Sequence, residues 1–119
     1  MEKIIILTLL LGTYIFAENG LRTPTALEKN CLACHKKQQI PNELIYKRYL
    51  VKYSTDARME EAIAKYLNNP TQETSIMPGP FFLKFPMREK LDLDEQLIRS
   101  SIKQFLKKFD LKQHLILEK

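Results

Sequence analysis

The stretch Cys31-Leu32-Ala33-Cys34-His35 decides how this chain folds. It has the C-x-x-C-H spacing that attaches a c-type haem. In a helical turn Cys31 and Cys34 are three residues apart and Cys31 and His35 four, so the three side chains project from one side. Two thiols placed there form thioethers with the vinyl groups on one porphyrin edge, and the imidazole can bind the iron. The motif therefore predicts one haem c, covalently bound through two thioethers.

A C-x-x-C pair has three other uses in proteins besides haem attachment. A thioredoxin-like redox dithiol expects a βαβ setting, and no convincing strand is found in the sequence. A zinc site needs a fourth Cys, His or carboxylate ligand at regular spacing, whereas the only other histidine, His114, lies far away in a lysine-rich tail. A structural disulfide across two intervening residues is uncommon and stays as an alternative.

Residues 1–17 are typical of a signal peptide rather than of a folded domain. Lys3 precedes an apolar run over residues 4–16 that is too short to span a bilayer comfortably. Cleavage is expected after Ala17, which leaves one domain over residues 18–119. The −3 position holds an isoleucine, larger than the usual small residue, so an uncleaved N-terminal anchor is the alternative. Because bacterial haem attachment takes place outside the cytoplasmic membrane, the predicted location is the periplasm.

The length and net charge of the chain constrain the size of its core and the kind of partner it binds. The chain has 119 residues, enough for one small domain, and a covalent haem supplies apolar surface that so short a chain lacks. The net charge of +5 favours acidic partners or an anionic membrane face, and a surface chosen for solubility explains it equally well. Nucleic acid is not expected as a partner, because the protein is predicted to be exported and has no aromatic-basic groove pattern.

Periodicity predicts an all-α domain after the leader. A capping box over Thr25–Glu28 starts a short helix that runs into the haem motif. Residues 36–40 are expected to form a polar loop. Apolar residues at helical spacing then predict three helices, over residues 42–53, 55–67 and 92–109.

Two further stretches carry candidate residues for the haem site. The carbonyl of Pro41 is a candidate acceptor for the ring N–H of His35, and the same proline can simply start the next helix. Met77 lies in residues 76–80, where two prolines restrict the backbone to a stiff turn suited to holding a weak thioether ligand. The phenylalanines that follow are expected to wall an apolar pocket. Met87, also beside a proline, is a second candidate ligand.

These residues resemble the monohaem class I cytochromes c of bacterial periplasms. The resemblance rests on the short helix into the haem motif, the later helices and the Met77 loop, and covers most of the mature chain. It implies a small cytochrome c-like fold of about four helices around one covalent haem. It also implies that His35 is the proximal iron ligand and Met77 the distal one, with Met87, His114 or an open position as alternatives.

The family likeness carries one packing expectation and some departures. The first and last helices are expected to cross, with Leu27 near Phe105. The family often has a glycine early in its first helix, and this chain has none there. The stretch between Met77 and the last helix is also longer than in the smallest members, which is why Met87 stays a candidate.

The sequence predicts an electron carrier rather than an enzyme. A Met/His pair raises the reduction potential, and a six-coordinate iron has no vacant position for a substrate. A monomer is expected, with lysines that ring a haem edge and steer redox proteins with acidic docking surfaces: Lys29, Lys36, Lys37 and Lys84. Two other functions stay open. One is a haem-based gas sensor or ligand-binding protein, and the other is a small cytochrome subunit of a larger, membrane-associated oxidoreductase.

Overall fold

The structure, a computed structural model, describes residues 25–114, and every regular element in that range is helical. The expected signal peptide over residues 1–17 lies outside the described residues. The elements in chain order are η1 (Glu28–Leu32, a π-helix), α2 (Ala33–Lys37), α3 (Asn42–Tyr53), α4 (Asp56–Asn68), α5 (Phe81–Lys84), α6 (Glu95–Lys108) and η2 (Leu111–His114, a 3-10 helix). The predicted all-α class is confirmed.

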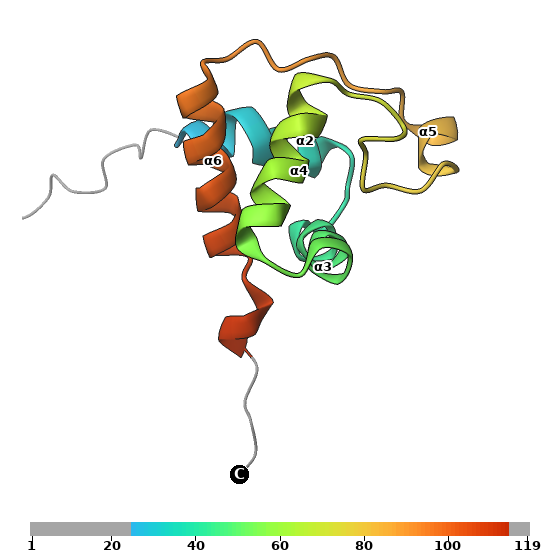
Figure 1. The fold of residues 1–119 in the computed structure, drawn as a ribbon. Helices are drawn as coiled ribbons and strands as arrows, with labels where there is room; N and C mark the ends of the chain where they lie inside the picture. The colour runs from blue at the N-terminus through green and yellow to red at the C-terminus, as the bar shows by residue number, and fades with distance from the viewer. Residues whose placement is uncertain (1–24, 115–119) are drawn as a thin grey trace, which may run out of the picture.

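Helices α4 and α6 lie side by side at the centre of the molecule (Figure 1). The contiguous helical segment of η1 and α2 lies behind them, and α3 packs against α4 from below. A long connection over residues 69–94, interrupted only by the single turn of α5, runs round the outer edge of the molecule between α4 and α6.

The helical stripes expected from the sequence form one apolar core. Tyr46 of α3 and Met59 of α4 are fully buried, and Ile98 and Ile102 of α6 are almost so. Leu27 and Phe105, expected to lie where the first and last helices meet, both belong to this cluster, whose buried members are Leu27, Ile45, Tyr46, Tyr49, Met59, Ala64, Leu67, Ile98, Ile102, Phe105 and Leu106. The core thus joins α3, α4, α6 and the residue that leads into η1.

Capping residues fix where the helices begin. The capping box is present: the Thr25 amide donates to Glu28 Oε2 at 2.8 Å and the Glu28 amide to Thr25 Oγ1 at 3.2 Å. Thr55 caps α4 by accepting from the Arg58 amide at 3.3 Å. Asp94 caps α6, so the predicted start at residue 92 was wrong by three residues. The Leu91 amide, upstream of this cap, donates to the Leu67 carbonyl at 3.1 Å.

The polar loop expected over residues 36–40 is shorter than predicted. Helix α2 continues to Lys37, and the Gln38 amide still donates to the Cys34 carbonyl at 3.0 Å. Gln39 then takes a left-handed conformation with φ 57°, which ends the helix, as is usual for a helix C-terminus. The prediction failed there because lysine and glutamine favour a helix wherever nothing stops it.

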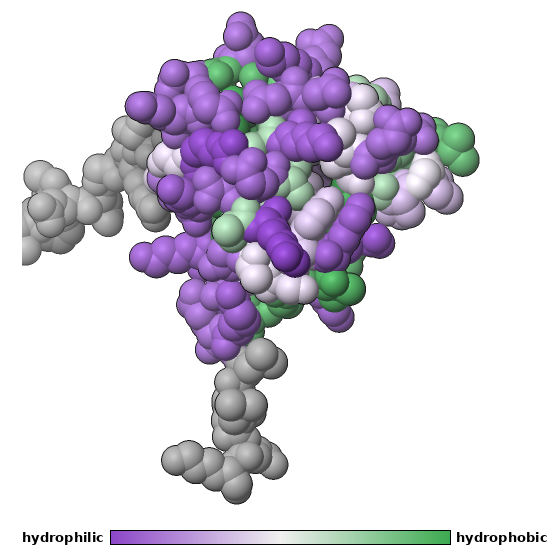
Figure 2. Space-filling view, in the orientation of Figure 1, coloured by the Kyte–Doolittle hydropathy of each residue, from purple (hydrophilic) through white to green (hydrophobic). Residues whose placement is uncertain are grey.

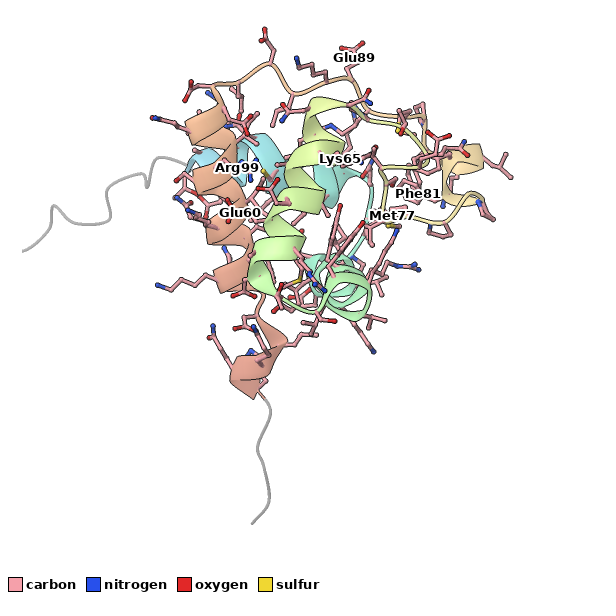
Figure 3. All side chains as sticks on the ribbon, viewed as in Figure 1. Glu60, Lys65, Met77, Phe81, Glu89 and Arg99 are labelled. Carbon is pink, nitrogen blue, oxygen red and sulfur yellow. The ribbon has the colours of Figure 1, made fainter. Side chains whose placement is uncertain are left out.

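Polar contacts tie the helices together at the surface. The Arg99 guanidinium on α6 reaches Glu61 of α4 at 2.6 Å and Glu95 of its own helix at 2.9 Å, and Figure 3 shows Arg99 beside Glu60 between the two helices. At the other end of the fold the Tyr46 hydroxyl donates to Asp110 Oδ1 at 2.9 Å. That bond spans most of the described chain and closes α3 against the residues after α6.

Candidate functional site

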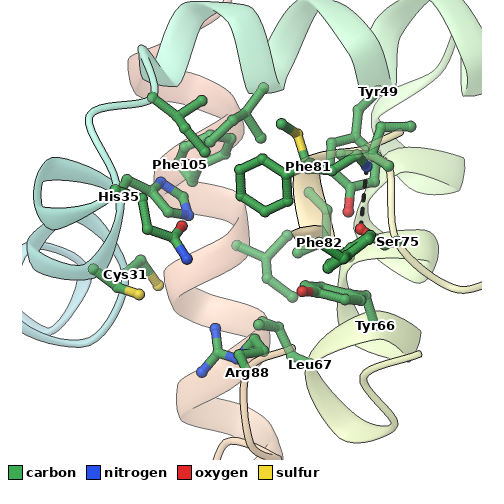
Figure 4. A pocket seen from close by; sticks show the side chains of 18 of the residues that line it. Cys31, His35, Tyr49, Tyr66, Leu67, Ser75, Phe81, Phe82, Arg88 and Phe105 are labelled. Carbon is green, nitrogen blue, oxygen red and sulfur yellow. Dashed lines mark hydrogen bonds between the residues drawn. The ribbon is translucent and has the colours of Figure 1, made fainter. Parts of the chain in front are cut away.

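One pocket gathers nearly all the residues singled out from the sequence. Its cavity volume is about 100 Å³, and the cavity is partly open to solvent. It lies between α2, the central helices and the connection that carries α5 (Figure 4). It is lined by Cys31, Cys34, His35, Gln38, Ile40, Ile45, Tyr49, Ile63, Tyr66, Leu67, Ser75, Ile76, Met77, Phe81, Phe82, Pro86, Arg88, Ile102 and Phe105.

The two cysteines and the histidine of the motif share one wall of this pocket. Cys31 ends up on the π-helical turn and Cys34 and His35 on α2, yet all three side chains line the same space, as the spacing predicted. Both thiols are free. Burial raises the pKa of the Cys31 thiol, and the positive charge of Arg88 partly opposes that rise. The arrangement offers two unbonded sulfurs and an imidazole to a group seated in the pocket.

The His35 ring is held from two sides. Its Nδ1 lies 2.6 Å from the side-chain oxygen Oδ1 of Asn42, the first residue of α3. Since an amide oxygen only accepts, Nδ1 carries the proton and Nε2 is left with a free lone pair. The ring also meets the edge of Phe105 on α6, with centroids 5.9 Å apart and planes at 81°. This fixes both the tautomer and the orientation that a metal-binding histidine needs.

The partner predicted for His35 was therefore wrong. The carbonyl of Pro41 accepts the amides of Leu44 and Ile45, at 3.1 and 3.3 Å, and so serves the start of α3. The neighbouring asparagine takes the place expected for that carbonyl. Pro41 itself is exposed and does not line the pocket.

Burial in the pocket lowers the pKa of His35 below its usual value. The hydrogen bond with Asn42 acts in the opposite direction, and the positive charge of Arg88 adds to the lowering. The imidazole is therefore neutral near pH 7, which is the form that binds a metal ion.

Met77 reaches the pocket from the connection after α4. Figure 3 shows it next to Phe81, on the stretch that leads into α5. Its backbone amide donates to the Ser75 hydroxyl at 3.1 Å, and Ser75 is itself buried. Upstream, Thr74 Oγ1 bonds the Asn69 carbonyl at 2.8 Å, so hydroxyl groups brace the turn on which Met77 stands.

The other candidate ligands lie outside the pocket lining. The sulfur of Met87 accepts a hydrogen bond from the Tyr66 hydroxyl at 3.8 Å, and Met87 is absent from the residues that face the pocket. His114 is exposed on η2, which packs against α3 at the far end of the fold. Of the three side chains considered for the distal position, Met77 is the one that shares the pocket with His35.

Aromatic side chains form the wall that faces the haem motif. In Figure 4 Tyr49 and Tyr66 lie across the pocket from Cys31 and His35, and the ring of Phe81 points into the space between them. Burial raises the pKa of Tyr66, against which the positive charge of Arg88 and a hydrogen bond with Ser75 act. The expectation that the phenylalanines after Met77 wall an apolar pocket is confirmed for Phe81 and Phe82 of α5 but not for Phe85, which does not line it.

Sequence reasoning missed Asn42, Ser75 and Arg88. Arg88 is the one lining residue with a permanent charge, and it comes from the connection between α5 and α6. Helical periodicity does not identify such residues, because their roles depend on where a non-helical segment meets the pocket. Asn42 alone had a local signal, since it is a polar side chain at the start of the predicted helix over residues 42–53, seven residues after His35.

Comparisons with family models, with curated proteins and with solved structures found no match to this chain. Within residues 25–114 no group of three or more His, Cys, Asp or Glu side chains is placed to hold a metal ion, which a zinc site needs. In the same range no helix is both long enough and apolar enough to cross a membrane.

The pocket's residues fit a covalently attached haem. Two free thiols, an imidazole with Nδ1 already hydrogen-bonded and a thioether are the donor set of a c-type site, and all four line one space. The remaining lining is mostly aliphatic and aromatic, as a planar apolar macrocycle requires.

Proposed function

We propose that this protein is an electron-transfer c-type cytochrome of the periplasm with one covalent haem. The observation that carries the proposal is the convergence of Cys31, Cys34, His35 and Met77 on one apolar pocket. The first three are close in sequence, whereas Met77 comes from a segment beyond two intervening helices. A thiol pair used for redox exchange or for zinc gives no reason for a methionine and a wall of aromatic rings at the same place.

Each residue has a definite task in this proposal. Cys31 and Cys34 attach the haem through thioethers, His35 binds the iron through Nε2, and Met77 gives its sulfur as the second ligand. The haem supplies a one-electron couple when bound, and the thioether ligand raises its reduction potential. Asn42 holds the imidazole in one tautomer, and Ser75 holds the backbone of Met77.

Apart from the haem site, electron transfer requires only a surface on which a redox partner can dock. Four exposed lysines lie on or beside elements that line the pocket: Lys29 on η1, Lys36 and Lys37 on α2 and Lys84 on α5. Figure 2 shows a largely hydrophilic face with hydrophobic residues at the edge where α5 lies, where Leu83 is 91 % exposed. An apolar spot beside cations fits a redox protein with an acidic surface that binds and leaves quickly.

Attachment of the haem is the first test. The protein is expressed together with the haem-attachment machinery, purified, and its pigment extracted with acidified organic solvent. A covalent haem stays with the protein, and Cys31→Ala with Cys34→Ala releases it. Colourless protein, or pigment that is extracted from the unaltered chain, contradicts the proposal.

The iron ligands separate an electron carrier from a gas sensor. The oxidised protein is expected to show the weak red absorption band of ferric iron bound by a thioether, and the reduced protein is expected to bind carbon monoxide slowly at neutral pH. Rapid binding of carbon monoxide contradicts the electron-carrier role while leaving the haem in place.

Mass analysis of the protein from its native host tests the leader, because cleavage after Ala17 removes residues 1–17.

A further inference from the structure

We propose that Arg88 sets the reduction potential of this site by holding a positive charge against the bound iron group, which favours its reduced form. The inference rests on the haem site proposed above. It concerns a residue that neither attaches the haem nor binds the iron.

The position of Arg88 is the first argument. Its side chain lines the pocket, and Figure 4 shows the guanidinium on the same side of the pocket as Cys31 and His35. Its Nε donates to the Glu89 carbonyl at 3.1 Å, which fixes the base of the guanidinium on its own segment. A charge held there faces the same space as the haem motif.

The side chain of Arg88 also has no ion-pair partner among the described residues. The ion pairs within residues 25–114 are made by Arg99 and Lys112, and none of them includes Arg88. No aspartate or glutamate lines the pocket. Its positive charge also acts across the pocket at Tyr66, where it opposes the rise that burial gives the pKa of the hydroxyl.

A cation next to an iron centre acts on its two oxidation states unequally. The oxidised form carries one more positive charge than the reduced form, so repulsion by Arg88 destabilises the oxidised form more. A unit charge about 10 Å away, at an effective dielectric constant of about 20 and partly open to solvent, changes the equilibrium by roughly threefold to tenfold. For a one-electron couple, a tenfold change corresponds to about 59 mV.

Potentiometric titration of the haem-loaded protein measures the effect directly. Arg88→Met keeps the length of the side chain and deletes the charge, and is expected to make reduction roughly threefold to tenfold less favourable. Arg88→Lys keeps the charge and is expected to stay within about twofold of the unaltered protein. Arg88→Gln serves as a second neutral variant where the methionine variant folds poorly. Equal thioether bands in all variants show that the iron ligands are unchanged.

Arg58→Met is the matched control. Arg58 is exposed at the start of α4, does not line the pocket, and its loss changes the net charge by the same amount. Its effect is expected to be small and to vanish at about 1 M salt, where screening acts within about 3 Å, while the effect of Arg88 persists.

The outcomes separate this inference from the function on which it rests. The role of Arg88 is overturned if, in haem-loaded protein, Arg88→Met shifts the potential no more than Arg58→Met, or if Arg88→Lys fails to restore it. Either result leaves the proposed cytochrome function standing. A chain that never retains haem overturns both.

Discussion

Asn42 Oδ1 lies 2.6 Å from Nδ1 of His35, and this contact links the first turn of α3 to the haem motif. The acceptor is a side chain, so it can be replaced without disturbing the backbone. Replacement by a stronger or a weaker acceptor therefore tests how far this hydrogen bond controls the ligand.

Asn42→Asp is expected to lower the reduction potential and Asn42→Leu to raise it. An ionised carboxylate strengthens the bond to Nδ1 and makes the imidazole a better donor to oxidised iron, whereas leucine removes the bond. Each change is expected to alter the reduction equilibrium by about threefold or more. Potentiometric titration gives the sign of both effects, and shifts in the same direction for the two variants contradict this role.

Met77→Ala is expected to abolish the red thioether band of the oxidised protein, and Met87→Ala to leave it unchanged. The reason is positional: Met77 lines the pocket, while the sulfur of Met87 accepts the Tyr66 hydroxyl at 3.8 Å. Absorption spectra of the two purified variants at equal haem content make the comparison. Retention of the band in Met77→Ala shows that another group binds the iron.

Ser75→Ala is expected to weaken thioether ligation without removing it. The Met77 amide loses its acceptor at 3.1 Å, and a hydrogen bond of this kind contributes about 0.5–1.5 kcal/mol, or roughly twofold to tenfold. Competition by added imidazole for the oxidised iron measures the change. Ser75→Thr keeps the hydroxyl and restores the affinity, and Ser100→Ala, on the exposed face of α6, is the control. Equal competition in Ser75→Ala and Ser100→Ala counts against a positioning role.

Tyr46→Phe is expected to destabilise the fold by about 1–2 kcal/mol near pH 7, because the Asp110 carboxylate loses a buried donor. Burial acts to raise the pKa of Asp110, but bonds from Tyr46 and the Lys112 amide prevail and lower it. A lowered carboxyl pKa gives stability that is present above the unfolded value of about 3.9 and is lost as pH falls through the folded value.

The difference between Tyr46→Phe and the unaltered protein is therefore expected to narrow below about pH 4. Urea unfolding at several pH values measures it. Tyr53→Phe is a suitable control, since the Tyr53 hydroxyl makes no hydrogen bond within the described residues. A difference that stays constant down to pH 3 would mean that the hydroxyl acts through packing rather than through the carboxylate.

The helices could be predicted because their signals are local. The range of α3 matches the prediction at both ends, and the capping residue Thr55 marks the start of α4. Helix α6 was placed too early because Asp92 and Asp94 are equally good caps in sequence, and in the structure it is the Asp94 carboxylate that accepts the amides of Gln96 and Leu97.

The residues of the candidate site likewise divide into those with a local sequence signal and those without one. The haem motif and Met77 were found because each has a distinctive sequence, and the structure brings them into one pocket. Leu97 has the helical spacing of the buried face of α6 but is 37 % exposed, while Ser101 on the same helix is 3 % exposed. Helical spacing predicts which residues share one face of a helix only to within one position. Which edge of that face is buried depends on where the neighbouring helix lies.

The connection over residues 69–94 supplies Met77, Phe81 and Arg88 to the pocket, yet only one helical turn lies within it. Its recorded bonds back to α4 are few, chiefly Leu91 to Leu67 and Met87 to Tyr66. A segment with so few bonds to the central helices is expected to have a lower local stability than those helices. In the proposed cytochrome, the sulfurs on η1 and α2 are therefore expected to bind the haem before this connection closes over it. Protease cleavage between residues 76 and 90 would accordingly be fast before haem attachment and slow after it.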